Sequence, residues 1–251
     1  MMQQVLAAIP QIDWALVLVY ARVQACILIL PALGERMLPA RLRVALALAV
    51  TPLLSDLVAA RPIPEAPLPI LTDIALQMAI GFMTGAFLRL LALALDVATT
   101  AIAATASLSQ IMGIQNETSP HPVGNLIQLA ALAVLMALGL PVMIIELLAD
   151  SLRIWPPGAF PDADYVLSNG ARIVADSFWL AMMLAAPFTV GGFLFQALSG
   201  VINRVMPSLP VIFIGAPVSI LLALVALAIL APLLISLWAD RVLGFMLPVT
   251  P

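Results

Sequence analysis

Long apolar runs, separated by short polar or proline-rich links, dominate the pattern of this chain. Six of the runs approach or exceed the ~20 residues that cross a bilayer as an α-helix. They are residues 14–33, 42–60, 70–95, 125–149, 173–203 and 212–239. A weaker run, 97–114, follows Asp96 and is rich in Ala, Thr and Ser. This pattern predicts about six apolar helical segments in a single membrane unit.

The composition assigns the chain to a broad class. It has 251 residues, of which 64% are hydrophobic and only 9% are charged, and its mean hydropathy is +1.17. Soluble domains carry about 25% charged residues, which they need to cover a surface that faces water. The sequence therefore predicts an all-α integral membrane protein. No basic patch interleaved with aromatic residues is present, which argues against nucleic-acid binding.

Proline is abundant in the apolar runs as well as in the links. The chain has 21 prolines, and six lie within or at the edges of apolar runs: Pro31, Pro52, Pro141, Pro187, Pro217 and Pro232. Each removes a backbone donor and can kink a helix. Two interpretations remain open: ordinary membrane helices that tolerate kinks, or bent helical hairpins packed into a larger assembly.

The candidate intramembrane charges, each in or beside an apolar run, are Arg22, Asp96 and Glu146. A charge at the bilayer centre costs at least ~2.5–3.5 kcal/mol, so Arg22 is expected to have a partner or a wet path. Asp73, Asp96 and Glu146 are the candidate acidic partners. The alternative is a structural Arg22 buried against carbonyl groups at a subunit contact.

Two glycines in "GFMTG" have the GxxxG spacing, Gly81 and Gly85. A helix face without side chains lets a second backbone approach closely. The spacing predicts tight helix packing at these two residues, within the chain or between subunits.

The residues needed for catalysis or metal binding are scarce. His121 is the only histidine and Cys26 the only cysteine, and neither has a companion at metal-ligand spacing. No set of nucleophile, base and oxyanion donors is recognisable. We therefore expect no catalytic residues, no metal and no cofactor.

The stretch "SLSQIMGIQNETSPHPVG", residues 107–124, differs from its surroundings. It is too long for a tight turn and too apolar for a solvated loop. Residue types alone favour, without deciding it, a cytoplasmic or periplasmic loop that joins two apolar segments.

Three stretches resemble the FliR family of type III export gate subunits. The first is "YARVQACILILPALGERMLPARLRVALALAV", with the matching positions Arg22, Pro31, Gly34, Pro39 and Arg43. The second is "NRVMPSLPVIFIGAPVSILLAL", with Arg204, Pro207, Phe213, Gly215 and Pro217. The third is "LADSLRIWPPGAF", with Ser151, Pro156, Pro157 and Gly158. Their order and spacing agree with the family over essentially the whole chain.

The chain also departs from the family pattern. Gln77 stands where the family usually has a Glu, and "AIAATASLSQ" has alanine in place of the family's glycines. The sequence "QNETSP" replaces a common Asp-Pro, and Pro210 replaces an Asn. These differences suggest a divergent branch and weaken the choice between a flagellar and a virulence system.

The resemblance implies a fold and a role. Residues 1–165 would correspond to the partner protein FliP and residues 166–251 to FliQ. FliP-like and FliQ-like subunits would assemble with the chain into a helical hetero-oligomeric export gate built from bent hairpins. The gate would pass unfolded flagellar proteins across the bacterial inner membrane at the flagellar basal body, as a structural pore-forming unit and not as an enzyme.

The resemblance also suggests a use for the unusual central stretch. In the family this segment forms a plug loop inside the pore. The matching residues here are Leu108, Ser109, Gln110, Ile111, Met112, Gly113, Ile114, Gln115, Asn116 and Glu117. The apolar members suit a dry constriction, and the polar members suit contacts with neighbouring subunits or pore water.

Three other functions compete with a flagellar gate subunit. One is the export gate of a virulence type III system, which shares the family. Another is a small-molecule secondary transporter, which typically shows an internal repeat that we do not find. The third is an intramembrane enzyme, which would need a catalytic set.

Overall fold

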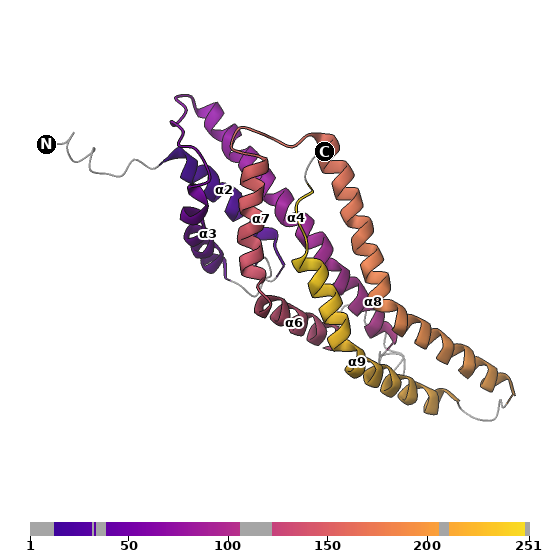
Figure 1. The fold of residues 1–251 in the computed structure, drawn as a ribbon. Helices are drawn as coiled ribbons and strands as arrows, with labels where there is room; N and C mark the ends of the chain where they lie inside the picture. Colours follow the sequence, from indigo (N-terminus) through magenta and orange to yellow (C-terminus); the bar gives the residue numbers. More distant parts are fainter. Residues whose placement is uncertain (1–12, 32, 34–38, 106–121, 206–210, 249–251) are drawn as a thin grey trace. The chain divides into compact units, whose positions relative to one another are not determined.

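The computed structural model describes residues 13–31, 33, 39–105, 122–205 and 211–248. Within these residues the chain forms α-helices and no β-strand (Figure 1), so the predicted all-α class is confirmed. The helices are α2 (Trp14–Ile29), α3 (Ala40–Ser55), α4 (Pro67–Thr105), α6 (Pro122–Ala137), α7 (Leu140–Ile154), α8 (Ala163–Val205) and α9 (Val211–Leu243).

The number of helices able to cross a membrane differs from the number of apolar runs. In the described residues three helical stretches are long and apolar enough: Pro67–Ile102, Ala163–Val205 and Pro217–Leu243. A fourth span results if Gly124–Ala137 and Leu140–Ile154 form one broken span. Helices α2 and α3 have 16 residues each, or about 24 Å at 1.5 Å per residue, short of the ~30 Å hydrocarbon core. The residues that the structure describes therefore contain three or four candidate spans and not six.

The weak run 97–114 does not begin a helix of its own. Helix α4 continues through Asp96 to Thr105 and has 39 residues. The hydroxyls of Thr99 and Thr100 donate to the Asp96 carbonyl at 3.1 and 2.8 Å, so these polar side chains are satisfied on the helix itself. The change in composition at Asp96 therefore leaves the helix unbroken.

The run 125–149 is interrupted where one helix was expected. Gly139 has a φ of 106°, in the left-handed region that favours glycine, and it precedes α7. Pro141 occupies the first turn of α7, where a missing backbone N–H costs nothing. The two residues together end α6 and start α7, which continues to Ile154.

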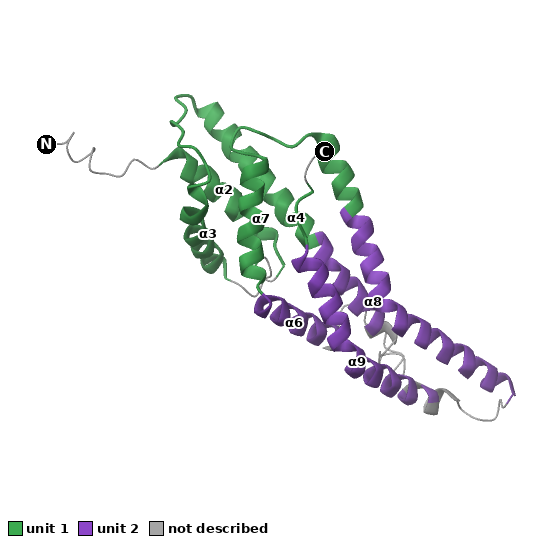
Figure 2. Cartoon of the chain, viewed as in Figure 1, with its two compact units in different colours: residues 1–89, 139–172, 245–251 green, residues 90–138, 173–244 purple. Residues whose placement is uncertain are grey.

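The chain divides into two compact units (Figure 2). Unit 1 comprises residues 1–89, 139–172 and 245–251, and unit 2 comprises residues 90–138 and 173–244. Both units contain residues from either side of the predicted boundary at 165/166. The assignment of a FliP-like and a FliQ-like part stays a prediction.

The core of unit 1 is built around α2. Asp13 caps the start of this helix, because its carboxylate accepts the backbone N–H of Ala15 at 3.1 Å. Side chains on several faces of α2 are buried, including Leu18, Val19 and Val23. Helix α2 is therefore an interior helix of its unit, and α3 packs beside it.

Within unit 2, side chains of α8 and α9 donate hydrogen bonds to the backbone of α4. Ser177 of α8 donates to the Leu90 carbonyl at 2.6 Å, and the Trp238 indole of α9 donates to the Ala92 carbonyl at 3.2 Å. Trp238 is only 1% exposed. These bonds attach α8 and the end of α9 to one turn of α4.

Candidate functional site

The most unusual site in the described residues surrounds Arg22, which is fully buried at 0% exposure. Its guanidinium lies among acceptors from α4 and from the end of α7. Nε donates to Gln77 Oε1 at 2.9 Å, and Nη2 donates to the same oxygen. Nη1 donates to the Ser151 carbonyl at 2.7 Å and, more weakly, to Ser151 Oγ at 3.4 Å. Nη2 also donates to the Trp155 carbonyl at 2.7 Å.

All of these acceptors are neutral. An arginine side chain has five N–H donors, and the bonds above are enough to engage each of them. Ser151 lies in the last turn of α7 and Trp155 is its C-cap residue. Backbone carbonyls at a helix C-terminus carry the negative end of the helix dipole, which favours a cation. The buried charge is thus stabilised by a helix end and one amide side chain.

The acidic partners predicted for Arg22 are not the ones it binds. Glu146 is exposed on α7 and Asp73 is half-buried on α4, while the hydrogen bonds of Arg22 go to Gln77, Ser151 and Trp155. Asp96 belongs to unit 2, where its carbonyl accepts the threonine hydroxyls of α4. The alternative interpretation, a structural Arg22 buried against carbonyl groups, describes the site. The carbonyl groups belong to this same chain.

Gln77 and Ser151 are the residues that sequence reasoning missed as partners. Gln77 is 1% exposed and Ser151 is fully buried. An uncharged polar side chain in an apolar run was the available signal for Gln77. The two carbonyl acceptors leave no mark in a sequence, because every residue carries one.

The two glycines of the GxxxG pair lie against α2. A Cβ added at Gly81 would be 2.1 Å from the Arg22 carbonyl oxygen, and one added at Gly85 would be 2.9 Å from the Cys26 carbonyl oxygen. Both distances are far below van der Waals contact. The absence of side chains on this face of α4 therefore lets its backbone reach that of α2 beside Arg22.

A second arginine caps a helix end in the same unit. Arg89 Nη1 of α4 donates to the carbonyl of Ile29, the last residue of α2, at 3.1 Å. Helix α4 thus contacts α2 at the two glycines, and it also contacts the C-terminus of α2 through the hydrogen bond from Arg89.

Aromatic residues extend the Arg22 site toward the end of the chain. The rings of Trp155 and Tyr165 meet edge to face, with centroids 5.1 Å apart. The Tyr165 hydroxyl donates to the Pro248 carbonyl at 2.6 Å. Tyr165 therefore contacts the Arg22 site on one side and the C-terminal segment on the other.

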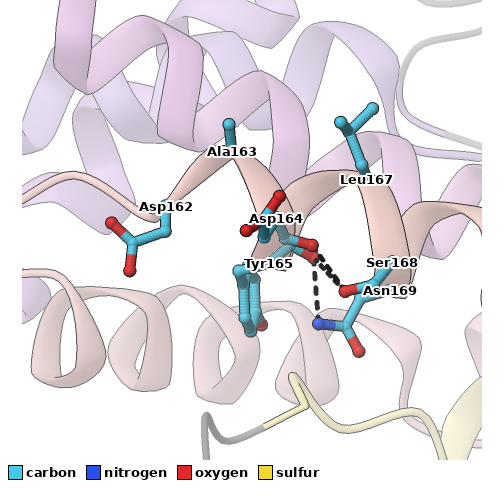
Figure 3. A pocket seen from close by; sticks show the side chains of 7 residues that line it. All are labelled: Asp162, Ala163, Asp164, Tyr165, Leu167, Ser168 and Asn169. Atoms are coloured by element: carbon cyan, nitrogen blue, oxygen red, sulfur yellow. Dashed lines mark hydrogen bonds between the residues drawn. The ribbon is translucent and has the colours of Figure 1, made fainter.

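A hollow of about 760 Å³ lies beside the first turns of α8 (Figure 3). It is lined by Asp162, Ala163, Asp164, Tyr165, Leu167, Ser168 and Asn169. The Ser168 hydroxyl and the Asn169 amide donate to carbonyls one turn earlier, at 2.5 Å to Asp164 and 3.0 Å to Tyr165. The side chains of Ser168 and Asn169 thus bond within the helix itself. In the part of the chain that is described, no three His, Cys, Asp or Glu residues form a cluster able to hold a metal.

The ten candidate plug residues, 108–117, all lie outside the described residues. The structure therefore adds no geometry to that prediction.

The apolar surface of the long helices defines the class of protein. The stretch Pro217–Leu243 has a mean hydropathy of 3.0, and only 6% of its most apolar window is buried inside the chain. A surface this apolar must be covered by lipid or by other proteins. The fold is that of an all-α integral membrane protein.

The comparison with known proteins identifies the family within this class. Residues 14–244 match the family described as "Bacterial export proteins, family 1". The chain belongs to this family. It is 30% identical over 228 residues to the flagellar biosynthetic protein FliR of Caulobacter vibrioides, covering 89% of this chain and 91% of the relative. It is 26% identical over 221 residues to the flagellar biosynthetic protein FliR of Aquifex aeolicus, covering 87% and 86%.

Proposed function

We propose that this chain is a structural subunit of the flagellar type III protein export gate. The observation that carries the proposal is the similarity, over most of the chain, to relatives named as flagellar biosynthetic proteins within an export family. Those names also favour a flagellar system over a virulence system. The role is that of a pore-forming unit without catalytic activity of its own, in the bacterial inner membrane at the flagellar basal body.

The exposed apolar helices support assembly with other membrane subunits. Large side chains of α9 are exposed in the isolated chain, among them Leu221 at 62%, Ile229 at 71% and Leu233 at 54%. Lipid can cover part of such a surface, and neighbouring helices can cover the rest. We infer that the partners are FliP-like and FliQ-like export gate subunits and that unfolded flagellar proteins are the cargo.

We further propose that residues 108–117 form the plug of the closed pore. Irregular backbone at membrane depth is stable only inside protein or along a cavity. The segment contains Leu108, Ile111, Met112 and Ile114 for a dry constriction, and Met adapts to varied surfaces. Gly113 lets the chain bend between them.

The test of the gate assignment is deletion of this gene in its own host. The expected result is loss of flagellar proteins from the culture medium while other secreted proteins are unchanged, with export restored by a plasmid-borne copy. Normal flagellar export in the deletion strain would contradict the assignment. Loss of a virulence secretion substrate in its place would reassign the chain to the other type III system.

The test of the plug is ion conductance of the assembled gate in planar bilayers. Removing residues 108–117, or replacing them with ten Gly and Ser residues, is expected to make the gate leak while the complex still forms. The equal-length replacement is the control that separates loss of apolar side chains from shortening of the chain. A closed gate with both variants would contradict the plug.

A further inference from the structure

The final described residues of the chain leave α9 and pack in the other unit. Helix α9 ends at Leu243 within unit 2, whereas residues 245–248 belong to unit 1 and form no helix (Figure 2). The turn between them is at Gly244, where an added Cβ would be 2.9 Å from the Asp240 carbonyl oxygen. A glycine is thus what allows the chain to turn away from the helix there.

Leu247 and Pro248 attach this segment to unit 1. Leu247 is 4% exposed, whereas its neighbour Met246 is 81% exposed, so one side chain points inward and the other outward. The Pro248 carbonyl accepts the Tyr165 hydroxyl at 2.6 Å. Tyr165 in turn packs against the ring of Trp155, whose carbonyl binds Arg22.

We propose that residues 245–248 form a strap that opens and closes on unit 1, with the Tyr165 hydroxyl as its fastening. In the described residues no backbone–backbone hydrogen bond ties residues 245–248 to a neighbouring segment. A short segment without backbone hydrogen bonds to its neighbours opens at a lower free energy than the whole fold. The closed strap buries Leu247 and satisfies the Tyr165 hydroxyl, and the open strap exposes both to their surroundings.

The proposal is tested with cysteines placed at adjacent positions of opposite exposure. Leu247→Cys and Met246→Cys are made separately in the full chain, purified in detergent, and labelled with a maleimide. The native Cys26, which is fully buried on α2, stays in place as a reporter of general unfolding. Peptide mass spectrometry gives the labelling rate at each thiol.

A closed strap predicts that the thiol at 247 is labelled at least about tenfold more slowly than the thiol at 246, because burial of an apolar side chain opposes opening. Tyr165→Phe keeps the ring and removes the hydroxyl. It is expected to raise the rate at 247 about fivefold, the effect of one net hydrogen bond, while Cys26 stays unlabelled.

The matched control is Tyr20→Phe, since Tyr20 is the only other tyrosine and its hydroxyl lies 3.5 Å from Gln24 Oε1 on α2. This control is expected to leave the rate at 247 unchanged. Equal rates at 246 and 247, or no response to Tyr165→Phe, would overturn the strap. Parallel acceleration at 247 and at Cys26 would also overturn it, because the segment would then open only with the rest of the unit.

Discussion

The Arg22 site of unit 1 and the helix α9 of unit 2 differ in what their side chains contact. Arg22 carries a charge in an apolar setting, yet every acceptor that it uses comes from the same chain. Helix α9 is mostly apolar, yet only 6% of its most apolar window is buried inside the chain. The hydrogen bonds of Arg22 are all made within the isolated chain. The apolar side chains of α9 depend on lipid or on partner subunits to cover them.

This difference shows where the chain depends on assembly. Changes at the Arg22 site should damage folding whether or not partners are present. Changes on the outer face of α9 should leave folding intact and affect membrane insertion and assembly. The following predictions test this separation, in order of decreasing effect.

The largest effect is expected at the contact between α4 and α2. Gly81→Leu places a Cβ 2.1 Å from the Arg22 carbonyl oxygen, so the two backbones must separate and the folded chain should be lost. Fluorescence-detected size exclusion of a tagged chain in mild detergent measures the folded fraction. Gly191→Leu on α8 is the control, because nothing lies within 4 Å of its added Cβ. A folded Gly81→Leu chain would show that the close approach is not needed.

The next effect is expected from removing the neutral acceptor of the buried charge. Gln77→Leu leaves Nε of Arg22 without its acceptor, and an unsatisfied buried donor on a charged group costs about 3 kcal/mol. The free energy of unfolding is measured by denaturant titration in micelles.

Two variants sharpen the result at Gln77. Gln77→Glu supplies a carboxylate. In a well-paired buried ion pair the attraction roughly offsets the cost of desolvation, so the free energy of unfolding should lie within about 1 kcal/mol of the parent's. Gln196→Leu, at an exposed position on α8, should be neutral. Equal stability of the Gln77→Leu chain and its parent would mean that the helix-end carbonyls alone satisfy Arg22.

A charge on the outer face of α9 should have a different signature. Ile229→Asp introduces an acidic group at a position that is 71% exposed, and an aspartate near the bilayer centre costs about 2.5–3.5 kcal/mol of insertion free energy. The expected result is lower membrane integration, measured by alkaline extraction, with unchanged unfolding of the protein that is recovered in detergent. Ile229→Val is the control. Lowered stability in detergent would break the distinction between the two regions.

The smallest effect is expected where α9 is supported by its own chain. Trp238→Phe removes the bond to the Ala92 carbonyl and leaves that buried acceptor with one partner fewer, at a cost of about 1 kcal/mol. The free energy of unfolding in micelles should be lower by this amount. Trp179→Phe on α8 is the matched control, since Trp179 is 63% exposed. Equal losses from both substitutions would assign the effect to tryptophan content and not to the bond.

The sequence predicted helix content and membrane class because both follow from local composition. The GxxxG spacing also indicated Gly81 and Gly85 as a face without side chains, and α2 lies against that face. Long continuous runs were less informative about helix ends. One glycine with positive φ divides the run 125–149, and a run that looked separate continues α4.

The partners of Arg22 could not be predicted for a physical reason. Acidic residues were the obvious candidates, since opposite charges attract at any distance along the chain. The actual acceptors are an amide 55 residues away and carbonyls 129 and 133 residues away. Carbonyls are present at every residue, so only the tertiary fold selects those at the end of α7.

Membership of an export gate is tested most directly by native mass spectrometry after co-expression of this chain with the FliP-like and FliQ-like proteins of the same organism. A gate subunit is expected to give a discrete complex in which one copy of this chain is joined to several copies of its partners. A stable monomer or homodimer that leaves both partners unbound would contradict it and would bring a small-molecule transporter forward.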